Sequence, residues 1–331
     1  MESVEDKERV LSGFRPSGPL HIGHLVGALQ NWVALQDRYR CFYAICDWHA
    51  LTSEYANTEK IRDYVFQMAL DWLAAGLDPE RSTLFVQSRV KEHAELHLLL
   101  SMIVPLGWLE RVPTYKEQQL QVTGRDLTNY GFLGYPVLQA ADILCYKAQW
   151  VPVGEDQISH LELCREIARR FNTLYGEVFP EPQPRTTPVS RLPGTDGRKM
   201  SKSYNNAIYL SDPEPETRKK IMTMVTDPAR VRRSDPGNPD VCPVFTLHKA
   251  FSTAPTIEKV NLECRRAGIG CIDCKGFLLE HLNPLVAPLR ERREALAGRP
   301  GRVREILDTG AEKARSVASA TLQEVRDAVR I

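Results

Sequence analysis

The sequence has no apolar stretch long enough to cross a membrane, and neither sign of charge dominates. A spanning helix needs about 18 or more consecutive apolar residues, and no run here approaches that length. The formal net charge is +1, so there is no overall electrostatic case for a nucleic-acid partner, although a locally basic face remains possible. The opening residues MESVEDKERV are polar and acidic, unlike a secretion signal. We therefore expect a cytoplasmic protein with no membrane partner.

The chain does have the size and the apolar content for a substantial core. Its 331 residues, 43% hydrophobic and 26% charged, fit one large domain plus a smaller one. Eight cysteines in a reducing compartment are not expected to form a disulfide framework. Four of them, Cys41, Cys46, Cys145 and Cys164, lie in apolar surroundings and are expected to be small buried side chains.

Apolar runs alternate with amphipathic stretches through the first two hundred residues. Strands are expected at 9–14, 41–51 and 82–88, and the helices that follow them at 21–39, 58–77 and 92–104. Residues 135–171 continue the pattern with a helix, a strand, a turn and a helix. Strands that alternate with helices predict an α/β fold, a doubly wound parallel sheet with helices on both faces. Ligands bind such sheets at the carboxyl ends of the strands.

The composition changes near residue 204. The stretch 180–203 is rich in Pro, Gly, Thr and Ser, and beyond Asp212 only helical patterns follow. We therefore expect a catalytic domain at 1–204 and a smaller, all-helical domain at 205–331, whose last helices could pack back on the first domain.

Two histidines flank one glycine in the segment RPSGPLHIGHL, residues 15–25. A helix start after a strand needs the turn residues and Gly23, but it does not need His21 and His24. A helix N-terminus presents free N–H groups and a positive dipole end to phosphates, and imidazoles there can donate to phosphoryl oxygens. The alternative is a pair of surface histidines at a helix start.

A second basic segment, GRKMSKS at 197–203, lies far along the chain. Lys199 and Lys202 are mobile charges suited to phosphate, and Gly194 and Gly197 suit a lid that closes over a polyphosphate. The alternative is a solvated linker between domains. This interpretation is less favoured when the segment is considered together with the histidine turn.

Together the two segments resemble the signature pair of the class I aminoacyl-tRNA synthetases. The stretches GALQNWVALQ, CFYAICDWHALT, YPVLQAADILCY and VPVGEDQ further resemble the bacterial-type tryptophanyl-tRNA synthetases. The resemblance covers roughly residues 9 to 330. It implies a Rossmann-like catalytic domain, a homodimer, and three ligands: L-tryptophan, ATP with Mg²⁺, and tRNA(Trp). The implied reaction forms tryptophanyl-adenylate and pyrophosphate, then transfers tryptophan to the tRNA.

The resemblance also assigns the nucleotide site. His21, His24, Lys199, Lys202 and Ser201 are expected to contact the phosphates and the leaving pyrophosphate. The remaining ATP-site residues implied are Arg15, Pro16, Ser17, Gly23, Gly154, Glu155, Asp156, Gln157, Val189, Met200 and Ser203. Mg²⁺ is expected to be held chiefly by phosphates and water, because it sheds water reluctantly.

Asp142, in the mostly apolar segment QAADIL, is the expected determinant of amino-acid choice. A buried carboxylate needs a partner, and the indole N–H is a donor without acceptor capacity. Tyr135, Gln139 and His49 are further candidates for the tryptophan pocket; Gln139 stands where many relatives carry Met. The alternative is a surface Asp142, either solvated or paired with Lys147.

The other four cysteines, Cys242, Cys264, Cys271 and Cys274, follow the pattern C-x21-C-x6-C-x2-C. Four thiolates can hold Zn²⁺ or a [4Fe–4S] cluster. Some tryptophanyl-tRNA synthetases carry this pattern with such a cluster, so the resemblance favours iron–sulfur over zinc and over free thiols. Basic stretches around the cysteines and in the tail could supply tRNA phosphate contacts.

Three rivals remain open on the sequence. A tyrosyl-tRNA synthetase shares both signatures, although the AADIL carboxylate and the GEDQ turn favour tryptophan. A non-charging, RNA-binding paralogue would be expected to have lost signature residues, yet this sequence retains His21, His24, Lys199 and Lys202. A small-molecule nucleotidyltransferase does not explain the long helical second domain.

Overall fold

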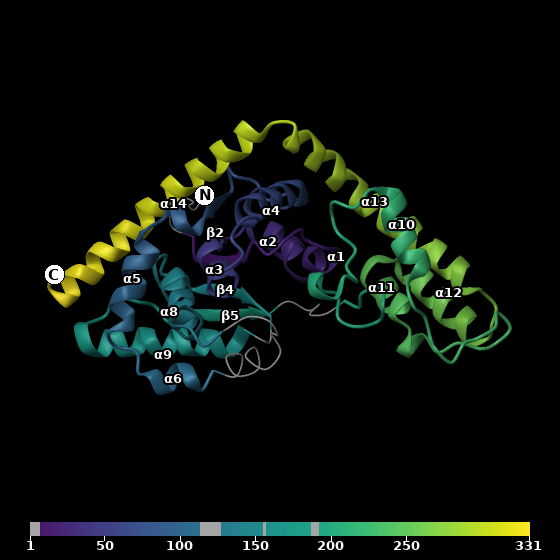
Figure 1. The fold of residues 1–331 in the computed structure, drawn as a ribbon, viewed down its shortest axis with the longest axis horizontal. Helices are drawn as coiled ribbons and strands as arrows, with labels where there is room; N and C mark the ends of the chain where they lie inside the picture. The colour runs from purple at the N-terminus through teal and green to yellow at the C-terminus, as the bar shows by residue number, and fades with distance from the viewer. Residues whose placement is uncertain (1–6, 113–126, 155–156, 187–191) are drawn as a thin grey trace.

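The computed structural model describes residues 7–112, 127–154, 157–186 and 192–331. These residues form a five-stranded, all-parallel sheet in the order β3-β2-β1-β4-β5 (Figure 1). The strands are β1 (Arg9–Phe14), β2 (Arg40–Ile45), β3 (Ser82–Val86), β4 (Trp150–Val153) and β5 (Gln183–Thr186).

Both faces of the sheet are buried, as a doubly wound fold requires. In β2, Tyr43 and Ile45 pack into one core, while Phe42 and Ala44 point into the other. The first core is covered by α2 (Gln30–Leu35) and α4 (Ile61–Ala75). The second is covered by α5 (Glu92–Ser101), α6 (Leu106–Glu110), α8 (Tyr130–Leu144) and α9 (Ile158–Tyr175). The predicted fold class is therefore confirmed.

Two predicted elements differ most from the structure in their bounds. The strand expected at 41–51 ends at Ile45, and the helix α3 (Asp47–Glu54) takes up the rest of the apolar run. A continuous apolar stretch does not reveal where a strand becomes a buried helix. The helix expected at 21–39 is divided into α1 (Ile22–His24), a π-helical segment η1 (Leu25–Leu29) and α2, which ends at Leu35.

Among the residues described beyond 191, helices and connecting loops occur, with isolated bridges but no strand. After the short turn η4 (Lys202–Tyr204) come α10 (Glu214–Thr223), η5 (Pro239–Val241), α11 (Pro243–Phe251), α12 (Ala254–Arg265), α13 (Cys271–Ala297) and α14 (Pro300–Val329). Helices α10, α11 and α12 gather around one end of α13 (Figure 1).

The two longest helices join this helical region to the sheet. α13 runs from the helical region to α4, and α14 then returns along the sheet beside β3 and α5 (Figure 1). The approach of α14 to β3 is so close that a Cβ at Gly310 would overlap the carbonyl of Leu84. None of the described helices combines the length and apolar character needed to cross a bilayer.

Candidate active site

A cavity of about 1130 Å³ opens at the carboxyl ends of β1, β2 and β4. It brings together every described residue that the sequence predicts for the ATP and tryptophan sites. These are Arg15, Pro16, Ser17, His21, Gly23, His24, His49, Tyr135, Gln139, Asp142, Gly154, Gln157, Lys199, Met200, Ser201, Lys202 and Ser203. Glu155, Asp156 and Val189 lie outside the described residues.

The two histidines of the turn are close neighbours and uncharged at neutral pH. Their ring centroids are 3.7 Å apart, and Nδ1 of His24 accepts a hydrogen bond of 3.1 Å from the backbone N–H of His21. Burial, followed by the charges of Lys202 and Lys199, lowers the pKa of His21 to about 4. Burial also places the pKa of His24 well below its ordinary value. A neutral His24 whose Nδ1 accepts carries its proton on Nε2, which leaves that nitrogen as a donor.

Gly23 has a specific steric reason to lack a side chain. A Cβ there would lie 2.9 Å from both Cε1 and Nδ1 of His21, too close for a real contact. The glycine therefore makes room for the first imidazole as well as for a ligand. His21 Nδ1 is buried and finds no hydrogen-bond partner among the described residues, although the residue lines the cavity.

The lysine-rich segment lies directly on the turn. Nζ of Lys202 donates to the carbonyl of Gly18 at 2.8 Å and to Oγ of Ser17 at 3.4 Å, across 184 and 185 residues of sequence. Met200 anchors the segment, with its side chain buried. Ser201 accepts a 3.3 Å bond from the N–H of Ser203. The fold thus places the predicted phosphate lid against the predicted phosphate turn.

The charge of Lys202 should make ATP use depend on pH. Burial lowers the pKa of Lys202 to about 8; the charge of Asp71 opposes this shift and that of Arg15 adds to it. The ammonium is therefore charged below pH 8 and neutral above it. We expect kcat/KM for ATP, which reports the free enzyme, to fall as pH rises through about 8.

The check is pyrophosphate exchange between pH 6.5 and 9.5 (about three units around the transition). Lys202→Arg is the matched control, because a guanidinium stays charged throughout this range. A fall at the same pH in that variant would show that another group titrates.

Asp142 is the shared acceptor of a buried hydrogen-bond network. Its carboxylate accepts from His49 Nε2 at 2.8 Å, from His93 Nδ1 at 2.6 Å and from Gln87 Nε2 at 2.8 Å. Burial alone would raise the pKa of Asp142, but the hydrogen bonds and charge interactions of His49 and His93 lower it below its ordinary value. Lys147 pairs with Glu324 instead, at 2.6 Å, so the surface alternative for Asp142 is wrong.

Sequence reasoning missed the partners that hold this site. Gln87 follows β3 directly, and its position at a strand's carboxyl end was a usable signal. His93 is fully buried in α5, and its Nε2 lies 2.7 Å from the hydroxyl of Tyr146. His160, in α9, lines the cavity and its Nε2 lies 2.7 Å from the hydroxyl of Tyr135. No local spacing links these histidines to the site.

Comparisons with known proteins agree with this geometry. The model of the family tRNA synthetases class I (W and Y) matches residues 3–287. The chain belongs to this family. A tryptophan–tRNA ligase of Thermotoga maritima is 55% identical over 325 residues, covering 98% of this chain and 99% of that protein. One from Aquifex aeolicus is 44% identical, covering 98% of this chain and 100% of that protein.

A solved structure shows the same architecture. The crystal structure of tryptophanyl-tRNA synthetase from Campylobacter jejuni, complexed with ADP and tryptophan, has a TM-score of 0.88 and 37% sequence identity. It covers 98% of this chain and 100% of that chain.

The late cysteines of this class I synthetase lie near enough for the charge of one thiolate to act on the pKa of another. Burial, and then the charges of Cys242, Cys264 and Cys271, raise the pKa of Cys274 to about 12. Burial also raises the pKa of Cys264; the charge of Arg230 opposes this shift, and those of Cys242 and Cys271 add to it. Arg230 NH1 lies 3.7 Å from Sγ of Cys264. Within the described ranges, however, no three His, Cys, Asp or Glu side chains are arranged as a metal site. The metal site therefore remains a prediction.

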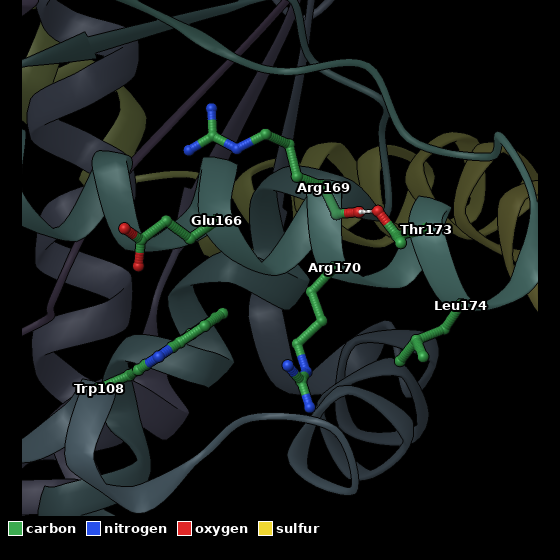
Figure 2. A pocket seen from close by; sticks show the side chains of 6 residues that line it. All are labelled: Trp108, Glu166, Arg169, Arg170, Thr173 and Leu174. Atoms are coloured by element: carbon green, nitrogen blue, oxygen red, sulfur yellow. Dashed lines mark hydrogen bonds between the residues drawn. The ribbon is translucent and has the colours of Figure 1, made fainter.

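A second, smaller depression on this synthetase is separate from the chemistry. It has a volume of about 410 Å³ and lies on α9 near α6, where the Arg170 guanidinium sits 5.7 Å from the ring centroid of Trp108 (Figure 2). Its other lining residues are Glu166, Arg169, Thr173 and Leu174. It contains none of the predicted site residues.

Proposed function

We propose that the chain is a tryptophan–tRNA ligase that activates L-tryptophan with ATP and charges tRNA(Trp). One observation carries the proposal: a single cavity joins the histidine turn, the lysine segment and the Asp142 network. The names of the nearly full-length relatives support tryptophan over tyrosine.

Adenylate formation needs alignment and neutralisation of the charge that grows on pyrophosphate. The amino-acid carboxylate attacks the α-phosphorus, the bond to the bridging oxygen breaks, and pyrophosphate leaves. His24 donates from Nε2, and His21 lies beside it. Lys199 and Lys202 neutralise the leaving group, and Ser201 adds a hydroxyl. When Mg²⁺ is bound with ATP, it supplies further charge neutralisation on the phosphates.

The proposed ATP contacts extend beyond the phosphates. Arg15, Pro16 and Ser17 line the approach to the turn, and Met200 and Ser203 lie in the segment above it. Gly154 and Gln157, at the end of β4, face the ribose and adenine in this proposal, together with Glu155, Asp156 and Val189.

Tryptophan is selected at Asp142 in this proposal. The carboxylate stays ionised and offers an acceptor to the indole N–H, and phenylalanine would leave that acceptor unpaired. Tyr135, Gln139 and His49 form the surrounding wall. His49 and His93 donate to Asp142, so its orientation is fixed before substrate arrives.

Pyrophosphate–ATP exchange with each amino acid tests the proposal. Exchange that depends on tryptophan, followed by charging of tRNA(Trp), is the expected result. Exchange with tyrosine in preference, or with neither amino acid, would overturn it.

We further propose that residues 1–204 form the catalytic domain and that 205–331 read the anticodon, in a homodimer. Four exposed apolar side chains on α5, α6 and α8 support the dimer. They are Leu98, Met102, Leu106 and Tyr130, exposed by 54%, 71%, 62% and 65%. Sedimentation of the wild type and of Met102→Glu tests it: a monomeric wild type would contradict the dimer.

We also propose that Cys242, Cys264, Cys271 and Cys274 hold a [4Fe–4S] cluster, with Zn²⁺ as the rival. The support is a set of four thiols within electrostatic range of one another and a donor chemistry that suits either metal. Anaerobic purification followed by iron, sulfide and zinc analysis decides between them. A colourless, iron-free protein would end the cluster proposal.

A further inference from the structure

Asp71 is a buried carboxylate that lies outside the predicted site yet contacts the histidine turn. It sits in α4 with a fully buried side chain. Its Oδ2 accepts a 3.1 Å hydrogen bond from the backbone N–H of Leu20, the residue that precedes His21. Its Oδ1 accepts from Nε of Arg293 at 2.7 Å. One carboxylate therefore connects the start of the phosphate turn to a guanidinium from another part of the chain.

The charge of this carboxylate also reaches the lysine segment. Burial raises the pKa of Asp71 and lowers that of Lys202, and the two opposite charges each partly offset the other's shift, after the larger effect of Arg293 on Asp71. Lys202 in turn donates to Gly18, two residues before Leu20. Asp71 is therefore bonded to the turn through Leu20, bonded to α13 through Arg293, and within range of the charge of Lys202.

Arg293 comes from α13, the helix that begins in the cysteine region. From Cys274 to Arg293 this helix extends about 28 Å, at 1.5 Å per residue. Arg293 is also hydrogen-bonded to Gln67 of α4, and Arg292 donates from Nε to the carbonyl of Ala74 at 2.8 Å. At the other end, Lys275 donates to the carbonyls of Met222 and Met224 at 2.8 and 2.6 Å. Both ends of α13 are therefore fixed by hydrogen bonds.

Stability alone is a poor explanation for this ion pair. A buried pair costs desolvation of both ions, and well-packed apolar side chains of similar volume often serve as well or better. An apolar pair, however, could neither accept the hydrogen bond from the Leu20 N–H nor attract the charge of Lys202. The geometry indicates a role in placing the turn and the lysine segment relative to α13.

We propose that Asp71 and Arg293 are positioning residues for ATP activation, and that this pair links the helical region to the phosphate turn. The inference rests on the proposed function, because it concerns the ATP step of that reaction. It predicts that a change at Arg293, in α13, alters ATP use although Arg293 does not line the ATP cavity.

The test measures KM for ATP and for tryptophan in pyrophosphate exchange without tRNA, on full-length variants. Arg293→Met is expected to raise KM for ATP about tenfold, a common size for coupling between sites, and to leave KM for tryptophan within about twofold of wild type. Asp71→Asn keeps an acceptor for Leu20 but loses the charge, so the same selective rise is expected. Arg292→Met is the matched control, from the same helix but without a carboxylate partner, and should leave both values unchanged.

The pair is then tested as a unit. If the two side chains act together, Asp71→Asn with Arg293→Met should raise KM for ATP no more than the larger single effect. Equal changes in both KM values, an unchanged KM for ATP, or additive effects would overturn the inference. Asp71→Leu with Arg293→Met replaces the ion pair with an apolar contact. Wild-type thermal stability with a raised KM for ATP supports positioning, and wild-type values of both contradict it. A wild-type protein with no tryptophan-dependent exchange would instead contradict the proposed function.

Discussion

Replacing both His21 and His24 with alanine is expected to lower kcat for tryptophan-dependent pyrophosphate exchange by at least about 10³-fold. Removing one preorganised donor to a developing charge commonly costs 10²–10³-fold, roughly 3–4 kcal/mol. Both rings line the cavity, and the hydrogen bond from the His21 backbone holds His24 in the tautomer that donates from Nε2. KM for tryptophan should change little, because the Asp142 network does not include either ring.

A matched control tests whether the loss is local. His281→Ala removes an imidazole of the helical region that is hydrogen-bonded to Thr256 and should leave exchange unaffected. His24→Gln, whose amide can place an N–H near the former Nε2, should recover part of the rate. Full-speed adenylate formation by the double alanine variant would contradict the phosphate role of the turn.

Replacing Asp142 with asparagine is expected to raise KM for tryptophan about 100-fold and to leave KM for ATP within about twofold. A hydrogen bond to a charged group contributes about 1.5–3 kcal/mol, and the variant loses the ionised acceptor for the indole N–H. The amide must also reorganise its bonds with His49, His93 and Gln87, because two of its four polar sites become donors.

The two substrates provide the internal control for this variant. A thermal melt shows whether the buried network still folds around the amide. With the fold intact, equal effects on the KM values of tryptophan and ATP would refute the assignment of Asp142 to the indole.

The sheet was accessible from the sequence pattern, and the meeting of the two signature segments was implied by the resemblance to the class I synthetases. Alternation of apolar runs and helical periods predicts strands and the helices that cover them, and parallel strands bring their carboxyl ends to one edge. The strand end at Ile45 was missed because CFYAICDWHAL is apolar across a change from strand to helix.

What the sequence could not supply were contacts that depend on tertiary structure. Asp71 and Arg293 are 222 residues apart, and neither belongs to a recognisable motif. The tautomer of His24 follows from one backbone bond, and the ionisation of Asp142 follows from His49 together with His93, a residue in α5 with no pattern of its own. Residue types identify candidate chemistry, whereas protonation and orientation are set by neighbours that only the fold brings close.

The central claim is that the histidine turn and the lysine segment act on one triphosphate. A crystal structure with tryptophan and a non-hydrolysable ATP analogue tests it most directly. The account predicts phosphate oxygens within hydrogen-bond distance of both His24 Nε2 and Lys202 Nζ. Phosphates bound away from either group would contradict it.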